Sequence, residues 1–357
     1  MITVIRDKEQ MLQLKSSWDA LARNSRIPLL QYDWFFACAE AACPPGQLYI
    51  VLNGTTKDFS AVAPCIRVRQ KGCTRLEVLG SSFLFEPTGF LYDSEQALDE
   101  ILDYLVSQDA PLILRRFGTD SLEVSRIPAA CDKRQFLQFR LGSTSPWLPI
   151  ETTWEKFEGS LSSKRRWTLR RARRRAEEIG PVQFQMVALD ETNVLRYLVE
   201  FMRVEEAGWK GREGTSLRLH PQLRKFFTAY TKTAARNGSL RMAFLRIGGQ
   251  PASALIGVEY ADRFWVLKIG YDEAFSHCSP GILLVHESIR HAFSRKLTGY
   301  EFLGSDEPWL HMWTEKIHQY LTYRLYPLST NSLLNLGMDG GKFMLRNAFH
   351  SKSARFA

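Results

Sequence analysis

The stretch KIGYDEAFSHCSPGILLVHESIRHAF, residues 268–293, decides the fold expected for this chain. A strand is expected to end near Gly270, a loop follows, and Ser279-Pro280-Gly281 predicts the start of a long amphipathic helix. Serine suits the N-cap position, and proline suits the first helical position. A helix N-terminus presents free backbone N–H groups and a partial positive charge, which favour a phosphate or pyrophosphate. An ordinary capped helix without a ligand would have the same sequence, so the neighbouring segments must decide.

Those neighbouring segments predict helices and strands in two related halves. The second half is expected to begin with a basic helix at 154–179, which Gly180-Pro181 ends. Two further helices are expected at 190–207 and 220–237, with a polar loop at 209–215 between them. The expected strands of this half are 182–189, 240–248, 251–260 and 262–272, followed by closing strands at 300–304 and 320–327. In the first half we expect a helix at 7–24, strands at 48–53, 60–69 and 74–80, a helix at 94–107 and a strand at 111–118. The shared order indicates an internal duplication of an α/β unit. We expect one half at 1–150, the other at 151–328 and a tail at 329–357.

The length and composition support this plan and exclude other classes of protein. A chain of 357 residues is about twice the usual single domain. With 45% hydrophobic and 24% charged residues it has a core-forming composition, which excludes a disordered chain. The longest apolar run, Trp34 to Ala39, is far below the roughly 20 residues of a membrane span. The charged start MITVIRDKEQ does not resemble a signal peptide, so a cytoplasmic location is expected. The 6 cysteines are scattered, and neither they nor the histidines have metal-ligand spacing, so no metal is predicted.

Five segments in a fixed order resemble the GNAT-type acyltransferases. The resemblance is to the branch similar to cellulose- and exopolysaccharide-biosynthesis acetyltransferases, which is related to the Fem aminoacyl transferases. It extends over about 155–326, and the first half resembles the degenerate GNAT-like half of the same proteins. The matching segments are SLSSKRRWTLRRARRRAEEIGPVQFQ (160–185), VEEAGWKGREGT (204–215), LRMAFLRIGGQPASALIGVEY (240–260), FWVLKIGYDEAFSHCSPGILL (264–284) and YEFLGSDEPW (300–309).

The resemblance implies an α/β (α+β) tandem GNAT-like fold of two mixed-sheet halves, with acyl-CoA, chiefly acetyl-CoA, as donor. In such folds the pantetheine arm inserts between two splayed strands, here 263–271 and 300–304, and a backbone N–H polarises the thioester carbonyl. The pyrophosphate would lie over the helix start. The usual GNAT phosphate loop, Q/R-x-x-G-x-G/A, is absent and SPG stands in its place, so an aminoacyl-tRNA donor stays open. The donor-binding residues implied are Lys268, Ile269, Gly270, Ser279, Pro280, Gly281 and Ile282.

Direct transfer to an amine or hydroxyl requires a group that takes the proton of the acceptor. The acceptor expected from the resemblance is a small molecule, a sugar or a polysaccharide-related compound. Glu205 and Asp306 are the preferred acid–base candidates over the neighbouring Glu206, Glu307 and His311, and Tyr271 is the candidate acid for the leaving thiolate. The residues expected to hold the acceptor, or a phosphate, are Trp209, Lys210, Arg212 and Trp309. No Cys or Ser is well placed to act as a nucleophile, so no covalent intermediate is expected.

The net charge of +9 comes from one segment. Eight basic and no acidic residues lie between Lys164 and Arg175, and without them 39 basic residues face 38 acidic ones. The basic helix could bind nucleic acid, an anionic membrane surface, or the phosphates of the donor. Few aromatics interleave with the arginines and the resembling family has a similarly basic helix, so nucleic acid is the least favoured partner. The residues expected on one anion-binding side are Arg166, Arg170, Arg173 and Arg174.

Overall fold

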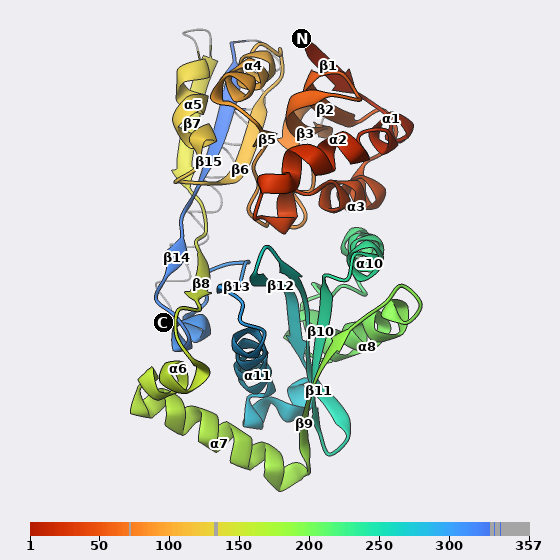
Figure 1. Ribbon diagram of the computed structural model, residues 1–357. Helices are drawn as coiled ribbons and strands as arrows, with labels where there is room; N and C mark the ends of the chain where they lie inside the picture. The colour runs from red at the N-terminus through yellow and green to blue at the C-terminus, as the bar shows by residue number, and fades with distance from the viewer. Residues whose placement is uncertain (71–72, 132–134, 329–331, 333–335, 337–357) are drawn as a thin grey trace.

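The computed structural model describes residues 1–70, 73–131, 135–328, 332 and 336, so nearly all of the expected tail lies outside the described residues. Two mixed sheets, one above the other in Figure 1, form the two halves. The first sheet has the strand order β1 (Ile2–Ile5), β2 (Leu48–Gly54), β3 (Phe59–Gln70), β4 (Cys73–Val78), β6 (Leu112–Gly118), β15 (Tyr320–Pro327) and β7 (Gln135–Leu141), with the short β5 (Leu91–Tyr92) on β3. The second has the order β14 (Ile317–His318), β8 (Ser145–Pro149), β13 (Gly299–Glu301), β12 (Arg263–Tyr271), β11 (Gln250–Tyr260), β10 (Leu240–Ile247) and β9 (Val182–Ala188).

The two sheets repeat one plan, which confirms the expected pair of related mixed-sheet halves. Strands β1 to β4 are antiparallel neighbours and β4 is parallel to β6; in the same way β9 to β12 are antiparallel neighbours and β12 is parallel to β13. A helix links the parallel pair in each half, because two parallel strands need a long crossover connection. These helices are α4 (Glu95–Val106) and α11 (Pro280–Ser294).

The halves exchange one strand, and this differs from the expected domain boundaries. Strand β8, at the end of the first half, lies between β13 and β14 of the second sheet, and β15, at the end of the second half, lies between β6 and β7 of the first. Each exchanged strand is hydrogen-bonded on both edges. Backbone pairing rather than chain proximity decides sheet membership, so a division at 150 and 328 does not describe the two sheets.

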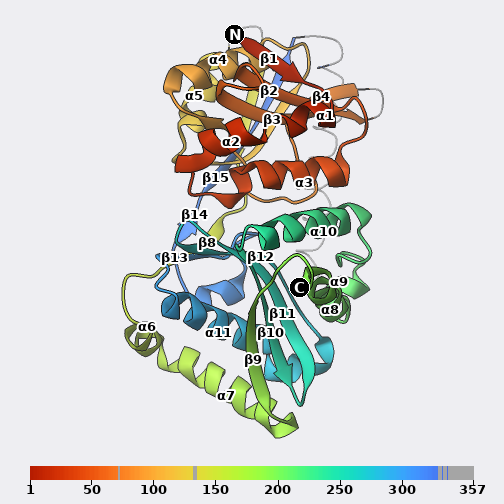
Figure 2. The ribbon, with the colours of Figure 1, turned by 45° about the vertical axis from the view of Figure 1, so that its right-hand side comes forward.

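The helices pack on the sheets in layers that join the two halves. Helices α1 (Lys8–Leu12), α2 (Lys15–Leu21), α3 (Tyr32–Ala42) and α5 (Leu122–Ala130) belong to the first half, and α6 (Trp154–Ser160), α7 (Ser163–Ile179), α8 (Val194–Glu206), α9 (Trp209–Arg212) and α10 (Pro221–Arg236) to the second. Helices α3 and α10 lie side by side in Figure 2, where Trp34 packs edge-on against Phe226 and Tyr230 with ring centroids 4.8 and 5.1 Å apart. One apolar core therefore continues from the first sheet to the α8–α10 face of the second, while α7 and α11 cover its other face. Among the described residues, no helix is long and apolar enough to span a bilayer.

Three of the predicted segments are interrupted in the structure. The predicted helix at 7–24 is divided into α1, α2 and a 3-10 turn, and the predicted basic helix at 154–179 breaks at Leu161 into α6 and α7. The side chain of Ser162 accepts a hydrogen bond from the Arg165 N–H at 3.3 Å and so starts α7 anew. The loop predicted at 209–215 contains the short helix α9. In each case a local cap or turn interrupts a periodic pattern, which periodicity alone does not reveal.

Candidate active site

The site begins where two neighbouring strands of the second sheet separate. Strands β12 and β13 pair only from Arg263↔Gly299 to Trp265↔Glu301. Immediately beyond, the register of β12 against β11 shifts, so that Leu267 is an extra, bulged residue. A bulge bends its strand, and the bend carries β12 away from β13. The second part of β12 therefore has no strand partner on its β13 side among the described residues.

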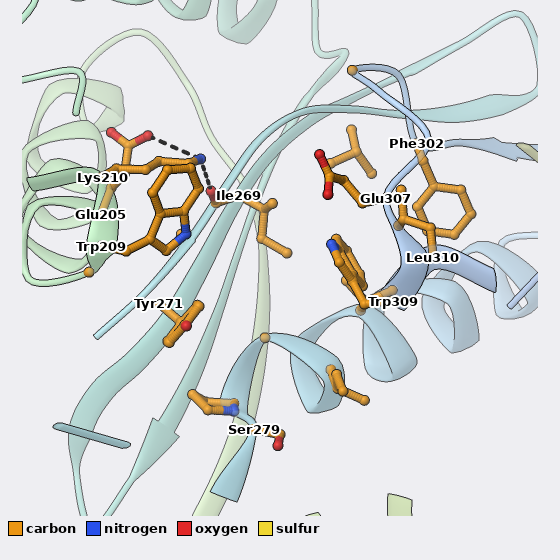
Figure 3. A pocket seen from close by; sticks show the side chains of 18 of the residues that line it. Glu205, Trp209, Lys210, Ile269, Tyr271, Ser279, Phe302, Glu307, Trp309 and Leu310 are labelled. Atoms are coloured by element: carbon orange, nitrogen blue, oxygen red, sulfur yellow. Dashed lines mark hydrogen bonds and ion pairs between the residues drawn. The ribbon is translucent and has the colours of Figure 1, made fainter. Parts of the chain in front are cut away.

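A cavity of about 690 Å³ occupies this separation. Figure 3 shows its two walls: Trp209 and Lys210 lie on one side of β12, and Phe302, Glu307 and Trp309 lie on the other. The beginning of α11 closes one end. The lining is largely apolar, and the apolar side chains are Val266, Ile269, Ile282, Val285, Phe302, Leu303 and Leu310. A long flexible chain with a polar end fits such a slot.

The start of α11 lines the cavity as expected, but Ser279 does not cap the helix with its side chain. Its backbone is left-handed, with φ 50° and ψ 56°, and its hydroxyl makes no capping hydrogen bond. Pro280 lacks an N–H, and the Ile282 N–H donates to the Ser279 carbonyl at 3.1 Å. A Cβ at Gly281 would lie 3.7 Å from a ring carbon of Tyr271, so the side of the helix start that faces the cavity is bare backbone. This is the local geometry that an anion needs for close approach.

Three of the predicted residues form a buried charged cluster beside β12. Glu205 is 1% exposed; its Oε2 accepts a hydrogen bond from the Leu217 N–H at 2.8 Å, and its Oε1 lies 3.5 Å from Lys210 Nζ and 3.6 Å from Lys268 Nζ. Lys210 Nζ also donates to the Ile269 carbonyl at 2.8 Å, at the cavity wall. Burial and the neighbouring charge of Lys268 lower the pKa of Lys210 to about 8, even though Glu205 opposes the shift.

Gly270 is needed for this cluster because of close packing. A Cβ there would lie 2.9 Å from both Cα and Cβ of Glu205, closer than real Cβ contacts occur. Only glycine therefore lets the last turn of α8 approach β12 closely enough for the Glu205 carboxylate to lie beside both lysines. Gly208 serves the same approach, since a Cβ there would meet the Tyr271 carbonyl at 2.5 Å.

Two side chains with polar tips reach the cavity without a partner among the described residues. Tyr271 follows the bulge on β12 and lies near the start of α11, and its hydroxyl makes no hydrogen bond with the described part of the chain. Glu307 precedes the 3-10 turn at Pro308–Met312, and its carboxylate points into the cavity opposite Lys210 (Figure 3). Trp209 and Trp309 are partly exposed and stand on the two opposite walls.

Several predicted residues lie elsewhere. Asp306 does not line the cavity; its Oδ1 lies 2.9 Å from His311 Nε2. Arg212 forms a bidentate ion pair with Glu273 outside the cavity. Lys268 contacts Glu205 but is not part of the cavity wall. Glu307 lies at the cavity wall instead, although the sequence favoured Asp306. The chain turns sharply after Gly304, and residue order near a turn does not reveal which side chain faces inward.

The four arginines predicted as one anion-binding side differ in what their side chains contact. Arg166 donates to the carbonyls of Gly159 and Leu161 at the end of α6, and Arg173 pairs with Glu177 at 2.7 Å. Arg170 and Arg174 instead point to solvent. None of the four lines the cavity in the described part of the chain. The break between α6 and α7 leaves the carbonyls of Gly159 and Leu161 free to accept hydrogen bonds from Arg166.

The first half holds one wall of the cavity through residues that the sequence did not suggest. Arg116 donates to the Gly304 carbonyl at 2.7 Å and to Ser145 Oγ at 2.6 Å, and Glu86 Oε2 accepts from the Gly304 N–H at 3.1 Å. Gly304 and Leu303 are both left-handed, with φ 56° and 54°. Burial raises the pKa of Glu86 although Arg116 opposes the shift. No local pattern links these residues, because their contacts span up to 218 positions.

Comparison with known proteins identifies the domain that contains the cavity. Residues 163–310 match a family model described as an acetyltransferase (GNAT) domain. A search of curated proteins gave no match. Three solved structures share the fold over nearly the whole chain. FemX has 13% identity and a TM-score of 0.56, covering 92% of this chain and 97% of its own.

The other two structures have similar TM-scores. The C-terminal domain of a proposed lysylphosphatidylglycerol synthetase from Agrobacterium fabrum has 10% identity and a TM-score of 0.54, covering 94% of this chain and 96% of its own. A protein of unknown function from Bacteroides thetaiotaomicron has 11% identity and a TM-score of 0.55, covering 91% and 100%. At these identities the likeness shows the fold alone. The family match and the strand order support an acyltransferase whose residues 163–310 are similar to a GNAT acetyltransferase domain.

Proposed function

We propose that this chain transfers an acyl group, acetyl in the simplest case, from acyl-CoA to an amine or hydroxyl of a small or saccharide-type acceptor. One observation carries the proposal: a single cavity extends from the bare start of α11, along an apolar slot, to an unpartnered carboxylate and a lysine of lowered pKa. The pyrophosphate of the donor would lie at Gly281, and the pantetheine between Ile269 and Phe302. Donor and acceptor then meet where β12 leaves β13.

The proposed reaction is direct transfer. The acceptor nitrogen or oxygen attacks the thioester carbonyl and gives its proton to the Glu307 carboxylate. The developing oxyanion is stabilised by backbone N–H groups on the open edge of β12 and by the ammonium of Lys210. The C–S bond breaks, and the Tyr271 hydroxyl supplies a proton to the leaving thiolate. Glu205 acts as a positioning residue, because its buried carboxylate holds the amines of Lys210 and Lys268 from behind.

The shape and charge of the cavity support a small acceptor. Trp209 and Trp309 offer flat apolar faces with a polar N–H, which suit the rings of a sugar. This agrees with the saccharide-related acceptor that the sequence resemblance implies.

An aminoacyl-tRNA donor is the competing possibility, because the fold is shared with FemX. Such a donor brings many phosphates, and Lys210 is the only cationic side chain among the described residues of the cavity wall. We therefore favour acyl-CoA.

Calorimetric titration with acetyl-CoA and with CoA tests the donor. We expect both to bind, and we expect binding to weaken in Gly281→Val, whose added methyl groups would occupy the bare helix start. A matched control is Gly159→Val, at an exposed position of helix α6 where the added Cβ would have no atom within 4 Å. Absence of binding to either compound, together with deacylation of an aminoacyl-tRNA by the same preparation, would refute the proposal.

A further inference from the structure

The outward face of α7 carries a stripe of cations around an exposed tryptophan. Trp167 is 53% exposed, although tryptophan is usually well buried. The spacing of three or four positions places its neighbours on the same side of the helix. All the members of this stripe are exposed; they are Lys164, Trp167, Arg170, Arg171 and Arg174.

The cations of this stripe are the basic residues of α7 that the protein itself does not engage. Carbonyls or carboxylates of neighbouring elements hold Arg165, Arg166 and Arg175, and Arg173 pairs with Glu177 of α7 and with Glu287 of α11. In contrast, Lys164 and Arg170 have no side-chain partner among the described residues. Arg171 lies over the Trp167 ring, 5.0 Å from its centroid, and Arg174 has only a distant, solvent-exposed contact with Glu178 at 3.7 Å. These charges thus remain available to an external anion.

The position of α7 leaves this stripe accessible to a flat surface. Helix α7 lies along the end of the molecule farthest from the first half, as both ribbon views show. Its inner side packs on the core through Leu169, Ala172 and Ala176. None of its residues lines the cavity in the described chain, so the stripe serves neither donor nor acceptor directly.

We propose that this stripe docks the enzyme on an anionic lipid surface. A tryptophan ring has an apolar body and a polar N–H, which suit the boundary between headgroups and acyl chains. Each Lys or Arg near an anionic surface strengthens binding about fivefold. The stripe belongs to a single helix at one end of the molecule, so a flat surface can approach it along its length. Proteins that bind single-stranded nucleic acid use a positively charged groove instead, with several stacking aromatics.

Sedimentation with lipid vesicles tests the proposal on the full chain. The probes are phosphatidylcholine vesicles with and without about one-third phosphatidylglycerol, at about 0.1 M salt, where the Debye length is about 10 Å. We expect binding only to the anionic vesicles. The triple variant R170Q/R171Q/R174Q should lose on the order of a hundredfold in partition coefficient, from about fivefold per cation. Both proteins should bind acetyl-CoA equally.

The matched control is R196Q/R203Q/K225Q, which removes three exposed cations on α8 and α10 that form no ion pair within the described chain. This control should retain full vesicle binding. A second measurement uses brominated lipid, whose quenching of tryptophan fluorescence should be lost in Trp167→Phe. Equal loss in both triple variants would overturn the proposal, as would equal binding to neutral vesicles. So would tighter binding to tRNA or duplex DNA than to anionic vesicles at the same salt.

Discussion

The lowered pKa of Lys210 makes a quantitative prediction about stability. The group changes from an ordinary pKa of 10.5 in the unfolded chain to about 8 in the folded one. One pKa unit corresponds to about 1.4 kcal/mol, so the folded state is penalised by about 3 kcal/mol wherever Lys210 is charged in both states, below pH 8. As the pH rises from 8 to 10.5, Lys210 loses its proton in the folded state before it does so in the unfolded state. The unfolded state then binds more protons, so the free energy of unfolding rises and the penalty disappears. The side chain is only 20% exposed, so little of this is screened by solvent.

Replacing Lys210 with methionine should therefore stabilise the protein and inactivate it. Methionine preserves the apolar stem, removes the penalty of about 3 kcal/mol, and loses the hydrogen bond to the Ile269 carbonyl, which is worth about 1 kcal/mol. We expect the free energy of unfolding in urea to rise by about 2 kcal/mol at pH 7 and not to rise at pH 10. Acyl transfer should fall sharply, because the oxyanion loses a cation.

Lys268→Met is the matched control for this measurement. Lys268 has the same exposed fraction and lies at nearly the same distance from the Glu205 carboxylate. Its removal takes a partner from a buried carboxylate but also removes the repulsion that lowers the pKa of Lys210, so we expect the free energy of unfolding at pH 7 to rise less than in Lys210→Met. If Lys210→Met lowered the free energy of unfolding at pH 7, or if its effect were the same at pH 7 and pH 10, the reasoning about a functional lysine of lowered pKa would be wrong.

Three further changes probe the cavity. Gly281→Ala should leave the melting temperature unchanged or slightly higher, because alanine is the better helix former by about 0.5–1 kcal/mol. The KM for acetyl-CoA should rise in this variant. An unchanged KM would show that the donor does not bind at the start of α11. Glu307→Gln should reduce kcat by about 10²–10⁴-fold without a change in melting temperature, whereas Asp306→Asn should have a much smaller effect; equal losses would argue against Glu307 as the proton acceptor. Gly270→Ala should destabilise the protein by about 1–3 kcal/mol in urea titrations, since its Cβ would meet Glu205 at 2.9 Å, and retained stability would show that α8 can move aside.

Much of the fold could be predicted because its signals are local. Strand and helix periodicity, the shared order of the two halves and the Ser-Pro-Gly helix start all depend on residues close together in the chain. The same holds for the part of the cavity built from α11 and β12, where Ile269, Tyr271 and Gly281 occur within one segment. The start of the helix was placed correctly, although the Ser279 side chain does not cap it.

The sequence by itself determined that this chain has two related α/β halves, a helix start suited to an anion, and a basic segment. Only the tertiary structure decided the reciprocal exchange of β8 and β15, the choice of Glu307 over Asp306 at the cavity wall, and the support of Gly304 by Arg116 and Glu86. It also divided the arginines of α7 into an engaged inner set and a free outer stripe. The physical reason is the same each time: periodicity reports the conformation of neighbours, whereas hydrogen bonds and ion pairs between distant segments form wherever folding brings their donors and acceptors together.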